Sequence, residues 1–437
     1  MLEKNIIQEF KNGGRLNRSV FHALLFRLSG LGLIFLLQVI LARLMGPKTY
    51  GDYTVIITTI NLILVLSVFG FDSSILRFLP SFIAKKDFAS ANGFVRFSYR
   101  TVAFLSIVCS IGLFIFLLLK HKKPNEIAYS EALLWGVFLI PFLAFMYQAS
   151  AVLRALNKIK TSLLSVYFLF PVLMGISCLY YYYSHNNRLP VDAAMLINLG
   201  CSATICIFII RRANKSLKKQ VPSEITAFEG KKWLSVSSIL FLTTALDLLL
   251  RQSDILMVGY FLNHTNAGYY SVAAKLALLA SIGLSVADYV FMPKIAALYE
   301  SRQLIKLQQF IRNSSLQILS ITLPVVFLLL LGGKWILSFF GKEFSSSYIP
   351  LVILLFGQII NAMTGMVGGL MTMTGHQKTF FAFYLIAFIM QFFLNIILIQ
   401  SIGIIGAAIG SSVSMVFLNL CAYTFVKRKL KIKASFF

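Results

Sequence analysis

Long apolar segments alternate with short polar ones along the whole of this 437-residue chain. A segment of about 20 mostly apolar residues can cross a bilayer as an α-helix, because each helical residue adds about 1.5 Å of length. The pattern predicts twelve such spans, at 20–42, 54–79, 94–119, 127–153, 161–183, 190–210, 233–262, 267–292, 314–338, 348–373, 379–400 and 403–426. The expected fold class is therefore an all-α polytopic membrane protein with about 12 transmembrane helices.

The composition agrees with this pattern and narrows the choice of partner. Hydrophobic residues make up 58% of the chain and charged residues 13%, a balance that excludes a soluble globular protein. The formal net charge is +25, but the Lys and Arg residues lie between the spans rather than on one compact surface, so no nucleic-acid partner is expected. The five cysteines and five histidines are scattered singly, so neither a metal site nor a cofactor is expected.

The basic residues gather on one side of the predicted membrane. With an even number of spans, both termini lie on that side, together with Lys85, Lys86, Arg154 and Lys158. Short basic connections stay in the cytoplasm by the positive-inside rule. The sequence therefore predicts a multi-pass protein of the cell (inner or plasma) membrane with both termini cytoplasmic.

A long basic connection divides the spans into two sets of six. We expect a cytoplasmic N-terminal segment, an N-terminal six-helix bundle, a basic cytoplasmic linker, a C-terminal six-helix bundle and a basic cytoplasmic tail, at 1–19, 20–210, 211–232, 233–426 and 427–437. The halves echo each other, since Tyr50-Gly-Asp-Tyr-Thr-Val55 at the start of span two resembles Ala267-Gly-Tyr-Tyr-Ser-Val272 at the start of span eight. Two pseudo-symmetric bundles are typical of transporters that hold substrate between the halves near the midplane and alternate access to it.

Span seven carries three charges, Asp247, Arg251 and Asp254. Their spacing of i, i+4 and i+7 places them on one face of a helix. Inserting a charged side chain at mid-membrane costs at least about 2.5 kcal/mol of free energy on insertion scales. This helix face is therefore expected to border a bundle interior, a water-filled cavity or an oppositely charged side chain. The functional interpretation is a transport pathway in which Arg251 is held between the two acids. The alternative is a set of ion pairs that only fixes helix packing.

Other intramembrane charges are further candidates for substrate binding or transport. Their depths in the spans predict two cross-helix pairs, Arg27 with Asp72 in the first half and Asp254 with Lys275 in the second. These pairs could instead only fix the packing of helices. The remaining candidates lie near the inner ends of their spans, where a charged side chain can also reach the interface and act as an anchor: Arg77 and Asp288.

Several short motifs resemble a known transporter family. Leu41-Ala-Arg-Leu-Met-Gly-Pro-Lys-Thr-Tyr-Gly-Asp-Tyr53 and Phe69-Gly-Phe-Asp-Ser-Ser-Ile-Leu-Arg-Phe-Leu-Pro80 resemble the N-terminal signature of the polysaccharide-transport flippases. Phe340-Gly-Lys-Glu-Phe-Ser-Ser-Ser-Tyr-Ile-Pro350 and Gly375-His-Gln-Lys378 resemble later landmarks of the same family. These are Wzx-type members of the superfamily that also holds the MATE drug exporters and the lipid II flippases. The resemblance covers both halves, although each motif rests mainly on glycines and aromatic residues.

The resemblance implies a flippase that moves a polyprenyl-diphosphate-linked oligosaccharide from the cytoplasmic to the outer leaflet for cell-surface polysaccharide biosynthesis. The implied partners are this lipid-linked oligosaccharide, membrane lipids, and a polysaccharide polymerase and glycosyltransferases of the same pathway. The alternative within the architecture is a cation-coupled drug exporter of the MATE type. No enzyme is expected, because the predicted outer loops are short and no Walker, HExxH or paired-carboxylate motif occurs.

The chemistry of the substrate gives Arg251 a role in this interpretation. Its guanidinium is always charged, and its fork of donors matches a pair of phosphate oxygens. We expect Arg251 to exchange one carboxylate, of Asp247 or Asp254, for the substrate diphosphate. A carboxylate released in this way has a raised pKa and can take up a proton.

Overall fold

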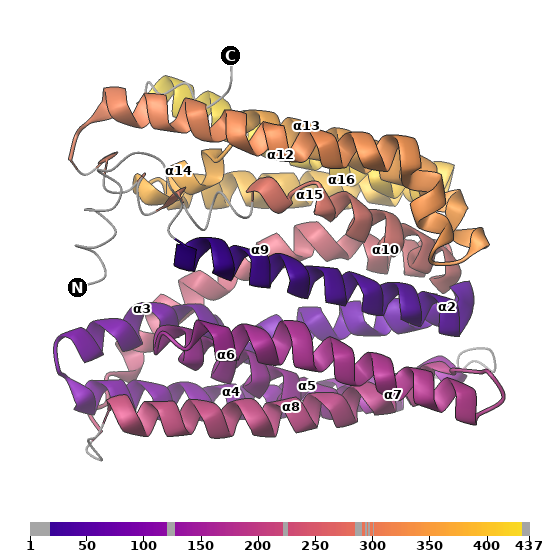
Figure 1. The fold of residues 1–437 in the computed structure, drawn as a ribbon, viewed down its shortest axis with the longest axis horizontal. Coiled ribbons are helices and arrows are strands. Elements are labelled where there is room, and N and C mark those ends of the chain that lie inside the picture. Colours follow the sequence, from indigo (N-terminus) through magenta and orange to yellow (C-terminus); the bar gives the residue numbers. More distant parts are fainter. Residues whose placement is uncertain are drawn as a thin grey trace.

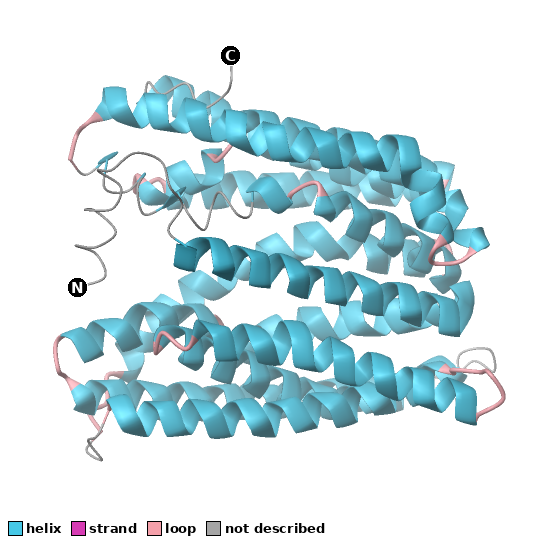
Figure 2. Cartoon of the chain, in the orientation of Figure 1, coloured by secondary structure: helices cyan, strands magenta, loops and turns pink. Residues whose placement is uncertain are grey.

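The chain folds almost entirely into long helices. The computed structural model describes residues 18–119, 127–221, 226–284, 291–292, 295, 298–299 and 301–430, and it describes the side chains of these residues except 18–28, 127–130 and 304. Within these residues every regular element is a helix (Figure 2). The all-α prediction is therefore confirmed.

The long helices follow the predicted spans closely. Ten helical segments of the described chain are long and apolar enough to cross a membrane. In chain order the elements are α2 (Arg18–Val68), α3 (Phe71–Ala84), α4 (Phe88–Leu119), α5 (Ile127–Ala155), α6 (Ile159–Leu163), η2 (Leu164–Leu169), α7 (Phe170–Ser184), α8 (Val191–Gln220), α9 (Gly230–Phe261), α10 (His264–Leu279), α12 (Leu304–Ser338), η3 (Lys342–Ser347), α13 (Tyr348–Thr364), α14 (Val367–Met373), α15 (Gln377–Ile402), α16 (Ile404–Phe425) and η4 (Val426–Leu430).

Element α2 contains two spans joined by a sharp turn. Gly46 has φ 72° and ψ 171°, a conformation that glycine adopts at low cost, and Pro47 follows it. The hydroxyl of Tyr50 donates a hydrogen bond of 3.0 Å to Oε1 of Gln38, although twelve residues along a straight helix span about 18 Å. The chain therefore reverses at Gly46, and the two arms of α2 are the first predicted span and the larger part of the second. Span eight corresponds, over its described part, to α10.

The structure departs from the predicted spans at three places. Span two is interrupted at Phe69 and Gly70, both with positive φ, so α3 is a separate helix. Span ten is interrupted at Gly365, also with positive φ, which separates α13 from α14. Most of the linker predicted at 211–232 is helical, because α8 continues to Gln220 and α9 already begins at Gly230. The hydropathy of a segment does not reveal such breaks, because the residues on either side of them are equally apolar.

The helices form two groups that lie one above the other in Figure 1, with the first arm of α2 between them. One group holds α3 to α8, and the other holds α10 and α12 to α16. Element α9 crosses from the first group to the second. At its start, Trp233 packs edge-on against Phe94 of α4 with ring centroids 5.4 Å apart. Near its end, Val258 lies in a buried cluster with residues of α10 and α16. The predicted boundary, which assigns all of this helix to the C-terminal bundle, stays a prediction.

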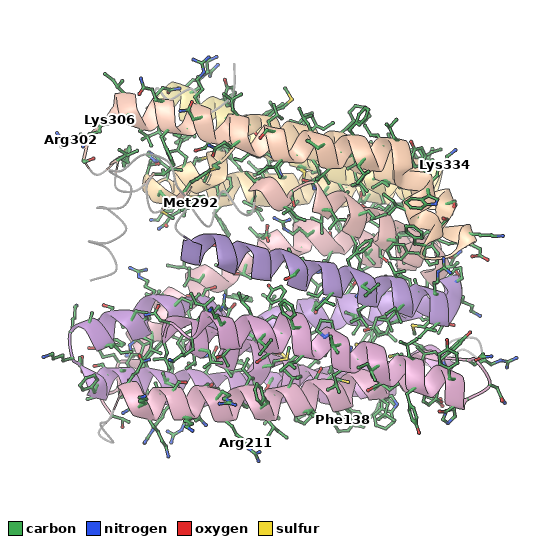
Figure 3. All side chains as sticks on the ribbon, viewed as in Figure 1. Phe138, Arg211, Met292, Arg302, Lys306 and Lys334 are labelled. Carbon is green, nitrogen blue, oxygen red and sulfur yellow. The ribbon has the colours of Figure 1, made fainter. Side chains whose placement is uncertain are left out.

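Basic side chains are concentrated at one end of the helices. Arg302, just before α12, and Lys306, in its first turn, lie at that end, whereas Lys334 lies near the opposite end of the same helix (Figure 3). The turn between α3 and α4, with Lys85 and Lys86, belongs to the end that holds Arg302 and Lys306, because an even number of spans separates the two places in the chain. We call this the basic end and the opposite one the outer end.

At the outer end the two halves meet backbone to backbone. A Cβ atom on Gly51 would overlap the carbonyl oxygen of His264, and one on Gly268 would lie 3.0 Å from Cα of Gly51. Gly51 and Gly268 occupy matching places in the two similar segments that begin spans two and eight. The likeness between these segments therefore corresponds to a contact between them.

We predict that Gly51→Ala destabilises the protein, because the added methyl group can be accommodated only if the His264 backbone moves. The apparent melting temperature in detergent, followed by size-exclusion chromatography after heating, is expected to fall by several degrees. Gly112→Ala is the matched control: Gly112 lies inside α4 with open space for 4 Å around the position of an added methyl group, and alanine favours a helix over glycine by roughly 0.5–1 kcal/mol. Equal melting temperatures for the two variants would contradict the close contact.

Candidate functional site

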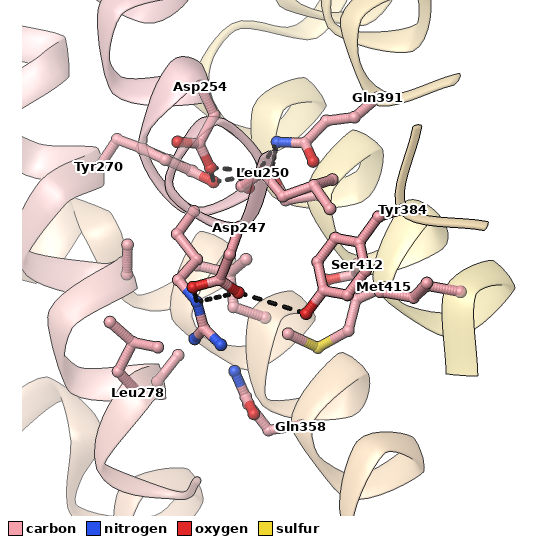
Figure 4. A pocket seen from close by; sticks show the side chains of 16 residues that line it. Asp247, Leu250, Asp254, Tyr270, Leu278, Gln358, Tyr384, Gln391, Ser412 and Met415 are labelled. Carbon is pink, nitrogen blue, oxygen red and sulfur yellow. Dashed lines mark hydrogen bonds and ion pairs between the residues drawn. The ribbon is translucent and has the colours of Figure 1, made fainter. Parts of the chain in front are cut away.

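A cavity of about 100 Å³ lies in the second group of helices, within the depth of the membrane spans. Its walls come from α9, α10, α13, α15 and α16 (Figure 4). Seven lining residues are leucine, alanine or methionine, and nine bring polar groups to the cavity: Asp247, Arg251, Asp254, Tyr270, Gln358, Tyr384, Gln391, Ser411 and Ser412. A pocket in which polar groups converge between apolar side chains is the usual form of a ligand site.

Asp247 and Arg251 form an ion pair on the wall of this cavity. Nε of Arg251 lies 3.0 Å from each carboxylate oxygen of Asp247. The hydroxyl of Tyr384, on α15, donates to Asp247 Oδ1 at 3.3 Å (Figure 4). Both charged side chains are about half exposed, at 45% for Arg251 and 41% for Asp247. The protein encloses neither side chain, so an anionic ligand can reach the pair and replace one partner.

Asp254 lies one turn further along α9 and is fully buried. Its Oδ2 accepts hydrogen bonds from the hydroxyls of Tyr270 at 2.5 Å and Ser411 at 2.8 Å, and its Oδ1 accepts the N–H of Ile255 at 2.9 Å. The prediction that Arg251 lies between two acids is therefore wrong. A helical side chain leans toward the N-terminus of its helix, so Arg251 reaches back to Asp247 and away from Asp254.

Lys275 does not pair with Asp254 either. Its Nζ donates to Oε1 of Gln38 at 2.7 Å and to the hydroxyl of Tyr50 at 3.0 Å, both on α2. On α10, Lys275 is five residues beyond Tyr270, which turns it by about 140°. Tyr270 therefore faces Asp254 on α9, while Lys275 faces the other half of the molecule. The predicted pair is replaced by a contact between the halves.

The other predicted site residues are spread along the chain. Asp72 lies in the first turn of α3, and Arg154 of α5 exerts an electrostatic interaction on it. Arg77 is exposed on α3. The side chain of Arg27 and all of Asp288 lie outside the described residues. The pair of Arg27 with Asp72 thus stays a prediction.

Sequence reasoning missed the neutral polar groups of the cavity. Gln391 is 1% exposed, and its Nε2 donates to the carbonyl of Leu250 at 3.1 Å and to Ser411 at 3.3 Å. Gln358 is 5% exposed and lines the same cavity. A glutamine near the middle of a predicted span is a signal that could have found both, because an amide is also costly to bury in lipid without a partner.

Two further contacts join the halves at the outer end. Nδ1 of His264 lies 2.6 Å from Oδ1 of Asp52, and both side chains are mostly buried. Arg43 donates to the backbone carbonyls of Phe339 at 2.6 Å and Ser338 at 3.3 Å, at the end of α12. Together with Lys275, these contacts tie α2 to α10 and α12. The outer end of the boundary between the halves is therefore closed.

The family described as polysaccharide biosynthesis proteins matches residues 16–298, which is more than half of the chain. The chain belongs to this family. Among curated relatives, the capsular polysaccharide biosynthesis protein CapF of Staphylococcus aureus is 22% identical over 400 residues, which cover 90% of this chain and 95% of the relative. The probable low-salt glycan biosynthesis flippase Agl15 of Haloferax volcanii is 23% identical over 162 residues, and the match spans 37% of this chain but only 34% of that protein.

Solved structures with the same fold are transporters. An inward-facing multidrug resistance MATE family transporter of the MOP superfamily superposes with a TM-score of 0.74 at 14% identity, covering 93% of this chain and 98% of that one. The lipid II flippase MurJ, in an inward closed conformation, superposes with a TM-score of 0.70 at 17% identity, covering 94% of this chain and 88% of that one. At such identities the likeness shows the fold alone. This polysaccharide biosynthesis family member thus has the fold of two pseudo-symmetric six-helix bundles.

We predict that replacing Asp254 destabilises the protein more than replacing Asp247 does. In Asp254→Asn the amide nitrogen must face either the donors on Tyr270 and Ser411 or the N–H of Ile255, and a buried donor left without an acceptor costs about 1–3 kcal/mol. In Asp247→Asn the side chain is not enclosed by the protein, so its amide can turn away from Arg251 and we expect a smaller loss. Thermal unfolding in detergent measures both. A smaller loss for Asp254→Asn than for Asp247→Asn would contradict the assigned hydrogen bonds.

Proposed function

We propose that this chain is a flippase that moves a polyprenyl-diphosphate-linked oligosaccharide from the cytoplasmic to the outer leaflet for cell-surface polysaccharide biosynthesis. The observation that carries the proposal is the half-open Asp247–Arg251 ion pair on the wall of an intramembrane cavity. Membership of the polysaccharide biosynthesis family supports it, as do the relatives CapF and Agl15 and the fold shared with MurJ. The role is transport rather than catalysis, and the polymerase and glycosyltransferases of the same pathway are the proposed functional partners.

The anionic end of such a substrate fits the chemistry of Arg251. Its guanidinium presents several N–H donors in one plane, and this fork matches two oxygens of a phosphate. On binding, the diphosphate replaces the carboxylate of Asp247, which keeps the hydrogen bond from Tyr384. The freed carboxylate can then take up a proton, because a charged acid in an apolar pocket is unfavourable without a cation. Asp254 takes no part in this exchange, since neutral donors already satisfy it.

The size of the cavity requires the halves to move. At about 100 Å³ the cavity is smaller than the pockets of about 300–1,000 Å³ that hold drug-sized ligands, so it can take a phosphate group but not an oligosaccharide. The outer end is closed by Asp52–His264, Arg43 and Lys275. Release toward the outside must therefore separate these contacts. Alternating access, with the outer end closed in the form described, is the transport mechanism that fits best.

The family separates this proposal from a MATE-type drug exporter. Drug exporters share the fold, but their 14% identity carries no substrate information. A cationic drug would be repelled by Arg251 and would favour acids left without a cation. In the cavity Asp247 is paired with Arg251 and Asp254 is shielded by hydroxyl groups. The observed polar groups thus favour an anionic substrate.

We predict that Arg251→Ala lowers delivery of surface polysaccharide by at least about tenfold, because a hydrogen bond to a charged group contributes about 1.5–3 kcal/mol. Arg251→Lys is expected to retain a fraction of the activity, since lysine keeps the charge but not the fork. The measurement is surface polysaccharide in cells that depend on this chain, normalised to the amount of the protein in the membrane. Arg211→Ala, an exposed residue of α8 outside the cavity, is the matched control. Normal delivery by a well-expressed Arg251→Ala would reject the proposed substrate contact.

We place the basic end in the cytoplasm of a cell or plasma membrane, with both termini there, on the strength of the charge distribution. An impermeant maleimide added to intact cells is then expected to label Ser346→Cys, exposed in η3, and not Lys218→Cys, exposed at the end of α8. The five native cysteines are replaced by serine in this experiment. Labelling of Lys218→Cys would invert the topology.

A further inference from the structure

A second hollow, a groove of about 480 Å³, lies between α4 and α9 at the basic end. It is separate from the cavity that holds Arg251, and the two share none of their lining residues. Its lining includes Phe97 of α4, Phe228 before α9, and Lys231, Leu234, Ser235 and Ser238 of α9. The transport mechanism gives this groove no role.

The walls of the groove are held in place by close contacts. The N–H of Ala227 donates to the carbonyl of Ala89 at 3.1 Å, and a Cβ on Gly93 would overlap the carbonyl oxygen of Ala227. The ring of Phe228 packs edge-on against Phe97, with centroids 5.4 Å apart, and against Trp233 at 5.9 Å. Phe228 is nevertheless 74% exposed. The groove thus has fixed walls and an uncovered aromatic surface.

The polar groups of the groove are cationic or neutral. Lys231 is exposed and takes part in none of the described ion pairs, whereas its neighbour Lys232 is paired with Glu229 at 2.9 Å. On α4 the exposed Arg96 and Arg100 lie one residue before and three residues after Phe97, on the same side of the helix. Ser235 lies one helical turn beyond Lys231 on α9, on the same face, and its hydroxyl adds a hydrogen-bond donor to the groove. A ligand for this surface carries negative charge and an apolar part.

The depth of the groove matches the boundary between head groups and chains. Element α9 begins at Gly230, and Ser238 lies eight residues further, which is about 12 Å along the axis. The head-group region of one leaflet is about 5–8 Å thick, so the groove begins among the head groups and ends among the first methylene groups. With the start of α9 taken as the level of the head groups, we infer that Lys231 lies near the phosphates and Leu234, three residues further along, near the first methylene groups.

We propose that this groove is a binding site for an anionic glycerophospholipid of the cytoplasmic leaflet. Lys231 binds the phosphate with help from Ser235, and one acyl chain lies over Leu234, Phe228 and Phe97. The charge of the groove selects anionic over zwitterionic head groups, because basic residues near a membrane surface attract anionic lipids. The site does not depend on the proposed flippase activity.

The test uses the purified full-length protein in nanodiscs with a trace of photoactivatable phosphatidylglycerol or phosphatidylcholine. Labelling of peptides that contain residues 226–238 is measured by mass spectrometry. Phosphatidylglycerol is expected to label this region about fivefold more than phosphatidylcholine, and Lys231→Gln should lower its labelling by about fivefold, the effect expected of one basic residue near a membrane surface. Lys232→Gln is the matched control and should change the labelling little, since Lys232 is already paired.

Three outcomes would overturn the proposal. Equal labelling by the two lipids would mean that the groove is only wetted by bulk lipid. No labelling by either would mean that something other than lipid covers it. A loss with Lys232→Gln as large as that with Lys231→Gln would likewise reject Lys231 as the specific contact. Arg96→Gln with Arg100→Gln serves as a second variant, expected to weaken labelling by phosphatidylglycerol without affecting phosphatidylcholine.

Discussion

A charge inside a bilayer must be paired, satisfied by hydrogen bonds or kept next to water, and this constraint arranges the polar groups of the second bundle. Asp247 and Arg251 satisfy it by pairing on the wall of a cavity. Asp254, only one turn away, satisfies it through the hydroxyls of Tyr270 and Ser411 and the N–H of Ile255. Two acids on one helix face therefore have different chemistry. The first can exchange its partner, whereas the second fixes α9 against α10 and α16.

The same constraint acts where the halves meet at the outer end. Lys275, Arg43 and the Asp52–His264 pair each find their partners in the opposite half. Separation of the halves removes all these partners together, so water must enter to replace them. Close contact between Gly51 and Gly268 brings the backbones near enough for these side chains to reach one another. Apolar packing closes the same boundary, since Phe35 packs edge-on against Phe340 and Tyr50 packs edge-on against Phe344. Opening therefore also exposes apolar surface.

The sequence was sufficient for the all-α class and for the order and approximate ends of most of the spans, because the thickness of the bilayer imposes a similar length on all of them. It was insufficient for the breaks at Gly70 and Gly365, which depend on packing around apolar segments that look continuous. The face of α9 that carries Asp247, Arg251 and Asp254 was also predicted, since helical periodicity fixes it. The partners on that face were not, because they depend on the direction of each side chain and on which neighbouring helix it meets. Lys275 illustrates this point: its depth matched Asp254, but its angular position on α10 turned it toward Gln38.

Element α9 meets different constraints at its two ends. Its first turns are held against the first bundle, where Ser237 donates to Ser74 at 2.9 Å and a Cβ on Gly70 would overlap the carbonyl oxygen of Ser237. Its last turns are held in the second bundle by Asp254 and by the buried contacts of Val258. Arg251 lies between these two anchored regions, near the end that belongs to the second bundle. Because one helix is fixed to both bundles, a displacement of either bundle relative to the other is transmitted along the element that carries the ion pair.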